Sequence, residues 1–262
     1  MKTFLFELCV ETLHAAKAAE RGGADRIELC SRLDIGGVTP DHGVTKAIIE
    51  ALSIPVHVLI RPRGGDFAYS GSEFDLMRQQ VGQAKSAGAG GVALGVLAAN
   101  GRVDLERSRE LVELARPMKV TFHRAFDETP EQGSTLEAVI ETGADCLLTS
   151  GGAPDVLRGA ESIARLVLQA GDRIRIMAGG GLKLASMGQL LERTGVCYLH
   201  GSLTRRVETR NGKIANGHTA AGAADILEAD VRAAVELLHT HFAATAPSLR
   251  HGPAANGGLR RG

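Results

Sequence analysis

The sequence predicts an α/β protein folded as one (β/α)8 TIM barrel. Eight short apolar segments alternate with longer segments in which apolar residues recur three and four positions apart, the spacing of one helix face. Strict alternation predicts a parallel sheet, and eight such units in about 250 residues suit a closed barrel. A doubly wound open sheet is the alternative, but no GxGxxG turn follows the first strand. The predicted strands are Phe4–Val10, Arg26–Ser31, Val56–Pro62, Gly91–Leu97, Lys119–Phe126, Cys146–Ser150, Ile174–Gly179 and Tyr198–Ser202.

A recurring turn leads into every second predicted strand. Gly23, Gly88, Gly143 and Gly195 each follow the end of a predicted helix, and we expect a strand to begin three residues later. Glycine suits this position because it adopts the positive φ that ends many helices. The second, fourth, sixth and eighth strands are therefore predicted to begin in the same way. The clearest predicted helices are Leu13–Arg21, Glu73–Ala87, Leu105–Ala115, Ala185–Arg193 and Asp225–Phe242, with Thr12, Ser72 and Asp104 as N-caps of the first three.

The composition excludes several classes of protein. The chain of 262 residues has 30 Lys+Arg and 30 Asp+Glu, and this balance argues against a nucleic-acid-binding protein, which would carry a basic excess. Four cysteines without a CxxC pair argue against a disulfide scaffold or a zinc site. No run of about 18 apolar residues and no signal peptide occur, so we expect a cytoplasmic protein. We expect a barrel domain over residues 1–245, a long loop at Arg205–Gly222 and a disordered tail over residues 246–262.

Charged residues interrupt predicted strands that should be almost wholly apolar in a barrel covered by helices. Glu7 and Cys9 share one face of the first strand, and Glu28 and Cys30 share the matching face of the second. An ionised carboxylate facing the helix layer would be costly, so we expect these faces to point into the barrel, near the C-terminal mouth where active sites form. There the two carboxylates should interact, which raises the pKa of one of them.

Cations and a histidine are expected at the same mouth. Arg61 ends the third predicted strand, His123 and Arg124 lie in the fifth, and Asp127 follows at its exit. We expect Arg61 or protonated His123 to compensate the two carboxylates. A buried ion network that only ties strands together is the alternative. The candidate catalytic residues, for acid–base chemistry, are Glu7, Glu28, Arg61, His123 and Asp127.

Glycine-rich turns follow the last three predicted strands. Such turns let backbone N–H groups approach an anion, and barrels often bind phosphate beyond strands 7 and 8, so we predict an anion or phosphate subsite; ordinary tight turns are the alternative. In the loop Arg61–Phe67, Arg63 or Asp66 is expected to reach over the mouth, unless the loop is a turn with solvated charges. The candidate anion-binding residues are Arg63, Arg124, Thr149, Ser150, Gly179, Gly180, Gly201 and Ser202.

Two long strings, Arg-Pro-Arg-Gly-Gly-Asp-Phe at Arg61–Phe67 and Thr-Phe-His-Arg-Ala-Phe-Asp at Thr121–Asp127, resemble the CutC family, whose members are known as copper homeostasis proteins. The resemblance runs from about Glu7 to Ser202. It implies a cytoplasmic (β/α)8 barrel, proposed to bind copper and often found as a homo-oligomer, which we expect here as a dimer or tetramer. Some members have further cysteines at two positions where this chain has Val10 and Ala68.

Copper chemistry is the first of three functional hypotheses. Cu(I) prefers soft thiolates, and Cys9 and Cys30 are expected at matching heights on adjacent strands. We predict them as copper ligands, with His123 as a further candidate; two core cysteines in register by chance are the alternative. Cys146 and Cys197, near the starts of their strands, are expected in the core.

The second hypothesis is a cofactor-free isomerase, lyase or hydrolase that acts on a small anionic, possibly phosphorylated, substrate. Arg61 and the glycine-rich turns would hold the anion, while Glu7, Glu28 and His123 move protons. The third hypothesis is a hard divalent ion, Mn²⁺ or Mg²⁺, bound by Glu7, Glu28 and His123. The neighbouring cations Arg61 and Arg124 argue against this third site.

Overall fold

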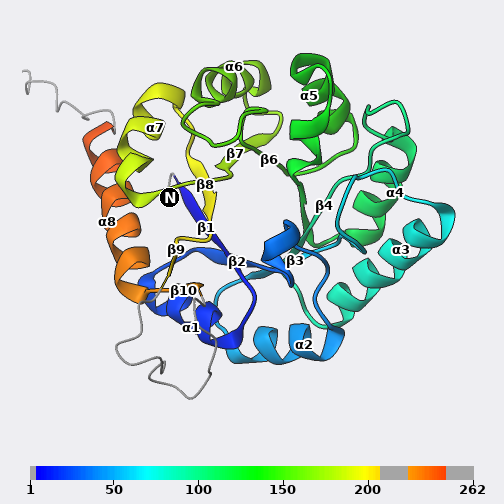
Figure 1. The fold of residues 1–262 in the computed structure, drawn as a ribbon, viewed down its shortest axis with the longest axis horizontal. Helices are drawn as coiled ribbons and strands as arrows, with labels where there is room; N and C mark the ends of the chain where they lie inside the picture. Colours follow the sequence, from blue (N-terminus) through cyan, green and yellow to red (C-terminus); the bar gives the residue numbers. More distant parts are fainter. Residues whose placement is uncertain (1–3, 207–223, 246–262) are drawn as a thin grey trace, which may run out of the picture.

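The protein is a closed barrel of eight parallel strands surrounded by helices, in a computed structural model that describes residues 4–206 and 224–245 (Figure 1). Each strand pairs with the next one along the chain, and β8 pairs with β1 to close the sheet. The predicted fold class is therefore confirmed. The barrel strands are β1 (Leu5–Val10), β2 (Arg26–Leu29), β3 (Val56–Leu59), β4 (Gly91–Leu94), β5 (Lys119–Phe122), β6 (Cys146–Thr149), β7 (Arg175–Gly179) and β8 (Tyr198–Gly201).

The helices form the outer ring. At the end of the described chain, α8 packs against α1 and α7 and completes this ring (Figure 1). The contact with α1 is tight, since a Cβ at Gly22 would lie 2.4 Å from that of Val231. The helices are α1 (Leu13–Gly22), α2 (His42–Ala51), α3 (Gly71–Ser86), α4 (Leu105–Ala115), α5 (Gln132–Glu141), α6 (Ala160–Ala170), α7 (Met187–Thr194) and α8 (Glu228–Thr245), with short 3-10 turns η1 (Leu33–Ile35), η2 (Arg124–Glu128) and η3 (Leu184–Ser186).

The glycine turns predicted from the sequence are confirmed. Gly23, Gly88, Gly143 and Gly195 have φ values of 92°, 85°, 83° and 66°. In each case the following strand begins three residues later. Glycine is required here because side chains with a Cβ rarely adopt a positive φ.

The helix starts at α3, α7 and α8 differ from the prediction by two or three residues, and at α3 the N-cap differs as well. Thr12 and Asp104 are N-caps as expected, but α3 begins at Gly71 with Ser70, not Ser72, as its N-cap. The Ser70 hydroxyl accepts from the Glu73 N–H, and the Glu73 carboxylate accepts from the Ser70 N–H. This reciprocal capping box satisfies two backbone donors, which fixes the start of the helix there.

The third and fifth strands end earlier than predicted, which moves key residues into loops. Beyond β3, the Arg61 N–H donates to the Thr39 hydroxyl instead of to a neighbouring strand. Beyond β5, the His123 side chain accepts from the Ala125 N–H and caps η2. Both residues therefore lie just beyond the C-terminal ends of their strands, where a barrel exposes its functional side chains.

The segment after β8 is only partly described. The expected loop Arg205–Gly222 begins within β9 (Thr204–Arg206), which pairs antiparallel with β10 (Ala224–Ile226). Residues 207–223 and the expected tail over residues 246–262 lie outside the described residues. In the described ranges, no helix combines the length and the apolar character needed to cross a membrane.

Candidate functional site

A closed polar layer lies inside the barrel below the mouth. Glu7 on β1 is opposite Arg26 on β2, and the Arg26 Nε lies 2.5 Å from Glu7 Oε2. His57 on β3 approaches the same carboxylate, with its Nδ1 3.9 Å from Glu7 Oε2. Burial opposes ionisation of Glu7, but Arg26 and a hydrogen bond to His200 outweigh it and hold the pKa of Glu7 well below its usual range. The cation that compensates Glu7 is thus Arg26, and the expectation of Arg61 or protonated His123 was wrong.

Two cysteine thiols meet above this layer. The Cys9 and Cys30 sulfurs are 3.2 Å apart, and Cys9 Sγ lies 3.4 Å from Glu28 Oε1. The prediction that Cys9 and Cys30 lie at matching heights on adjacent strands was wrong, because Cys9 pairs with Glu28 and Cys30 lies beyond the end of β2. The sulfurs nevertheless come together as predicted. The hydrogen bond to Cys30, burial and the Glu28 charge raise the pKa of Cys9 well above its usual value, so this thiol is protonated at neutral pH.

His200 on β8 connects the two carboxylates. Its Nδ1 lies 2.8 Å from Glu7 Oε1, and its Nε2 lies 4.0 Å from Glu28 Oε1. Burial would lower the pKa of His200, but Glu28 and Glu7 outweigh it and raise the pKa. Burial is also the main reason that the pKa of Glu28 is raised. The two carboxylates therefore have unequal pKa values, as the sequence predicted.

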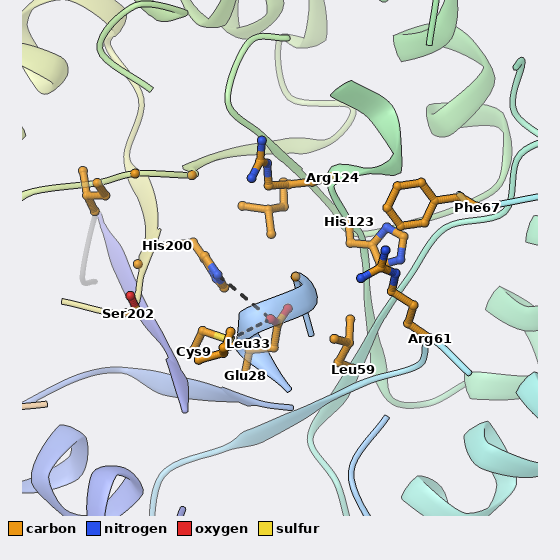
Figure 2. A pocket seen from close by; sticks show the side chains of 16 residues that line it. Cys9, Glu28, Leu33, Leu59, Arg61, Phe67, His123, Arg124, His200 and Ser202 are labelled. Carbon is orange, nitrogen blue, oxygen red and sulfur yellow. Dashed lines mark hydrogen bonds and ion pairs between the residues drawn. The ribbon is translucent and has the colours of Figure 1, made fainter. Parts of the chain in front are cut away.

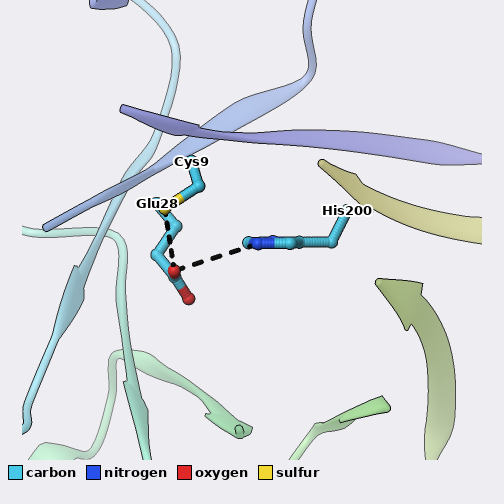
Figure 3. Close-up of side chains that lie close together, drawn as sticks. All are labelled: Cys9, Glu28 and His200. Atoms are coloured by element: carbon cyan, nitrogen blue, oxygen red, sulfur yellow. Dashed lines mark hydrogen bonds and ion pairs between the residues drawn. The ribbon is translucent and has the colours of Figure 1, made fainter. Parts of the chain in front are cut away.

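Cys9, Glu28 and His200 bring one sulfur, one oxygen and one nitrogen within 4.8 Å of one another (Figure 3). These are donor types that can hold a metal ion. The ligands that the sequence predicted for a hard divalent ion were Glu7, Glu28 and His123, and two of these three are not in the observed group. Glu7 is held by Arg26, and His123 is not part of this group, so only Glu28 belongs to both sets.

A cavity of about 230 Å³ opens at the C-terminal ends of the strands (Figure 2). Cys9, Glu28 and His200 lie on one side of it, and Arg61, His123 and Phe67 lie on the other. Both sides are largely buried, so charges there interact more strongly than in water. The lining residues are Cys9, Glu28, Leu33, Gly36, Leu59, Arg61, Phe67, His123, Arg124, Leu148, Gly180, Gly181, Leu182, His200, Gly201 and Ser202.

Arg61 is fixed by backbone carbonyl groups. Its Nη1 donates to Ile35 O at 3.2 Å and Gly37 O at 2.8 Å, and its Nη2 donates to Gly65 O at 2.7 Å. The guanidinium also lies over the Phe67 ring, 4.7 Å from its centroid. Arg61 thus holds the loops after β2 and β3 in place while lining the cavity.

His123 is a neutral residue of this wall. Burial and the Arg61 charge lower its pKa to about 3, so it does not supply the positive charge that we expected. Its Nδ1 accepts from the Ala125 N–H and therefore carries no proton. The neutral ring must carry its proton on Nε2, which is a hydrogen-bond donor.

Asp127, expected as catalytic, instead joins the turns after β5 and β6. Its carboxylate accepts from the Thr149 hydroxyl at 2.5 Å, from the Ser150 N–H and hydroxyl, from the Gly152 N–H and from Arg124 Nε. It is not among the lining residues. Asp127 therefore links these two turns beside the cavity and does not face a ligand in it.

The predicted anion-binding residues divide into two groups. Arg63 does not line the cavity and pairs with Glu73 and Asp66. It therefore fastens its own loop. Arg124, Gly180, Gly201 and Ser202 line the cavity, whereas Arg63, Thr149, Ser150 and Gly179 do not.

Three buried residues of the site were absent from the sequence prediction. Arg26 and His57 belong to the lower layer, and His200 joins it to the cavity. The period of two offered a signal, because Arg26 shares a strand face with Glu28, and His57 shares one with Leu59. His200 was noted only as part of a glycine-containing turn.

Known proteins resemble this chain along most of its length. A copper homeostasis protein cutC homolog from Homo sapiens is 43% identical over 220 residues, which cover 84% of this chain and 80% of the human one. A CutC family protein from Caulobacter vibrioides is 45% identical over 198 residues, covering 76% of this chain and 80% of its own.

Solved structures agree with this relationship. The crystal structure of a CutC protein from Streptococcus agalactiae matches with a TM-score of 0.73 at 32% identity and covers 76% of this chain and 98% of its own. The aldolase QR15, at 15% identity and a TM-score of 0.60, shares only the fold. The CutC family profile matches residues 4–205. The chain therefore belongs to the CutC family.

Proposed function

We propose that this chain takes part in copper homeostasis by binding Cu(I) through Cys9 and Cys30 at the base of the cavity. The observation that carries the proposal is the 3.2 Å approach of the two sulfurs beside the Glu28 carboxylate and the His200 imidazole. Thiolates are the ligands that Cu(I) prefers, and imidazole also suits copper. The names of the human and mouse relatives, copper homeostasis protein cutC homolog, support this role.

The cavity provides access for the ion. Cys9 lines it, whereas Cys30 is fully buried behind it, so copper would reach Cys9 first. Because the raised pKa keeps the Cys9 thiol protonated, binding must release protons, and apparent affinity should increase with pH. His200 and Glu28 are the nearest candidates for a third ligand.

Anaerobic titration with Cu(I) against a chromophoric chelator tests this proposal. We expect one tightly bound ion per chain, with loss of that ion in the double variant Cys9→Ser/Cys30→Ser. Cys197→Ser is the matched control, because this half-buried thiol precedes β8 at the other end of the barrel. X-ray absorption should show sulfur ligands in the wild type. Unchanged stoichiometry in the double variant would contradict copper binding at these thiols.

A second candidate function is acid–base catalysis without a cofactor on a small anionic, possibly phosphorylated, substrate. It is favoured by His200, which is hydrogen-bonded to Glu7 and faces Glu28, on the side of the cavity opposite Arg61. A carboxylate and an imidazole so placed can exchange protons with a bound substrate, as an isomerase, lyase or hydrolase requires.

Incubation of the protein with a metabolite extract in D₂O tests the second candidate. An enzyme that removes and returns a proton on carbon incorporates deuterium, and mass spectrometry detects the labelled or consumed compound. We expect Glu28→Gln to abolish the change and Glu141→Gln, on the exposed end of α5, to leave it intact. A metabolite extract that stays unchanged with the wild-type protein would count against this function.

Location and assembly complete the proposal. We propose that the protein is cytoplasmic and forms a homo-oligomer, as the resemblance of its sequence to the CutC family implies. Cell fractionation tests the location, and light scattering coupled to gel filtration tests the assembly. A monomer at micromolar concentration would contradict the expected dimer or tetramer.

A further inference from the structure

We infer that Arg61 and His123 form a binding subsite for the oxyanion group, a carboxylate or a phosphate, of a small ligand in the cavity. The subsite lies across the cavity from Cys9, Glu28 and His200 (Figure 2). It is distinct from the proposed copper ligands and does not require copper to be bound.

Within the described part of the chain, the charge of Arg61 has no carboxylate partner. Arg61 is only 6% exposed, and in residues 4–206 and 224–245 no acidic side chain forms an ion pair with it. Arg124, the other arginine in the cavity wall, differs in being half-exposed and paired with Asp127 at 2.8 Å. A buried charge without a counter-ion is costly, so the Arg61 guanidinium favours an anion at this wall.

The donor geometry of Arg61 fits such an anion. A guanidinium has five N–H donors, and the three carbonyl oxygens of Ile35, Gly37 and Gly65 account for three of them. The two that remain are the Nε–H, which is buried without a hydrogen-bond partner among the described groups, and one Nη2–H; the Tyr69 hydroxyl lies close to this guanidinium. These carbonyl contacts hold the side chain rigid, and two remaining donors can form the paired contact that arginine makes with carboxylate or phosphate.

His123 adds a neutral donor to the same wall. Its Nδ1 accepts from the Ala125 N–H, so the proton lies on Nε2, which is buried without a partner among the residues that the structure describes. Its ring centroid lies 4.9 Å from that of Phe67, and Arg61 lies over that same Phe67 ring. Two buried N–H donors without acceptors among the described groups are unusual in a folded protein, and both belong to residues that line the cavity.

Tyr69 places another polar group near this wall. Its hydroxyl is buried and lies close to the Arg61 guanidinium, whose charge and hydrogen-bonding approach both act on it, although no hydrogen bond of normal geometry to a described group forms. Burial nevertheless raises the pKa of Tyr69 to about 12, so the phenol is neutral and can donate a hydrogen bond. Among the described residues of this wall, no group therefore carries a negative charge that would repel an incoming anion.

The volume of the cavity limits the ligand. About 230 Å³ is less than the range of roughly 300–1,000 Å³ that is typical of drug-sized ligands. A small metabolite with one oxyanion group fits, with its other end toward Glu28 and His200. A dinucleotide or other large cofactor does not fit.

Binding of simple anions tests this subsite. Inorganic phosphate and malonate are titrated separately into the full-length, copper-free protein at pH 7 and constant ionic strength. Calorimetry gives the dissociation constant, and ¹⁵N-labelled histidine reports on the His123 ring. We expect at least one anion to bind saturably and to shift the His123 Nε2 resonance. Binding of phosphate alone assigns phosphate esters as the ligand class, and binding of malonate alone assigns carboxylates.

Variants locate the site. Arg61→Met should weaken binding at least about tenfold, because a charged hydrogen-bond pair is lost. His123→Asn should weaken it several-fold while keeping the cap of η2, since asparagine is a good N-cap; it decides the question if Arg61→Met does not fold. Arg109→Met, in an exposed pair with Glu141, is the charge-matched control and should bind as the wild type does. The inference is overturned if neither anion shifts His123 saturably, or if both site variants bind as tightly as the wild type.

Discussion

Replacing Arg26 tests how much its buried ion pair with Glu7 contributes to the stability of the fold. In Arg26→Met the Glu7 carboxylate, which is 1% exposed, loses its only arginine partner among the described residues and keeps its hydrogen bond to His200. Removing one partner of a buried pair costs about 3–5 kcal/mol, and the remaining hydrogen bond favours the lower end of that range. For a chain of this size, about 3 kcal/mol lowers the melting temperature by roughly 6–12 °C.

The pH dependence of this loss has a definite sign. In the wild type the pKa of Glu7 is held below its usual 4.5, so its contribution to stability is present above about pH 4.5 and is lost as pH falls through the folded pKa. Without Arg26, the largest opposing cause is lost and burial raises the pKa of Glu7, so the variant protonates this carboxylate at a higher pH than the wild type does. We therefore expect the difference in stability to be smaller at pH 5 than at pH 7.

Urea unfolding followed by circular dichroism at the two pH values measures this effect. Arg109→Met is the control, because its exposed pair with Glu141 should contribute no more than about 1 kcal/mol. Adding Glu7→Gln to Arg26→Met removes the unpaired charge and should recover part of the loss. The reasoning is refuted if Arg26→Met costs no more than Arg109→Met, or if Glu7→Gln worsens the Arg26→Met variant at pH 7.

Substitutions and a titration at five positions test local contacts. Gly159→Ala would place a Cβ 1.8 Å from the Ser150 carbonyl oxygen and should lower the free energy of unfolding by about 3 kcal/mol or more. Gly82→Ala lies inside α3, where the new Cβ has nothing within 4 Å, and should raise the free energy of unfolding by about 0.5–1 kcal/mol. Thermal melts measure both changes. Ser70→Ala should cost about 1 kcal/mol through loss of the capping box, and Ser72→Ala should cost less; equal losses would contradict the observed cap. ¹⁵N NMR should show that the pKa of the His200 imidazole is raised above its usual 6.5. The contribution of this group to stability is therefore present below pH 6.5 and is lost as pH rises through the folded pKa. A lower value would show that the carboxylates do not dominate its environment.

The order of strands and helices could be predicted because its signals are local. A glycine that ends a helix and a strand that begins three residues later are read from a few adjacent positions, as at Gly23 and Gly143. The period of two likewise predicted that Glu7 and Glu28 face the barrel interior. The apolar pattern predicted the ends of β3 and β5 too late, because apolar residues continue beyond the last strand pairing. There, hydrogen bonds that involve side chains turn the chain at Arg61 and His123.

The partners of the charged residues could not be predicted in the same way. Which residue of β2 lies beside Glu7 depends on the stagger between neighbouring strands, and that stagger is set by closure of the whole barrel. A shift of two residues replaced the expected Glu7–Glu28 pair by Glu7–Arg26 and Cys9–Glu28. His200 reaches Glu7 only because β8 pairs with β1, a contact between opposite ends of the domain.

The polar residues inside the barrel form two layers, which differ in how completely their charges are compensated within the protein. In the lower layer Glu7 is matched by Arg26, as folding stability requires of buried charges. In the upper layer the raised pKa of Glu28 reflects an incompletely compensated carboxylate, and Arg61 has no acidic partner in the described chain. A purely structural network would have gained stability by pairing these groups directly or by replacing them with apolar side chains. Their separation across a cavity instead suits a ligand that carries both a group for the Glu28 side and an anion for the Arg61 side. The lower pair should therefore tolerate joint replacement with retained binding, whereas replacement of Arg61 should weaken anion binding at least about tenfold even in a protein that remains folded.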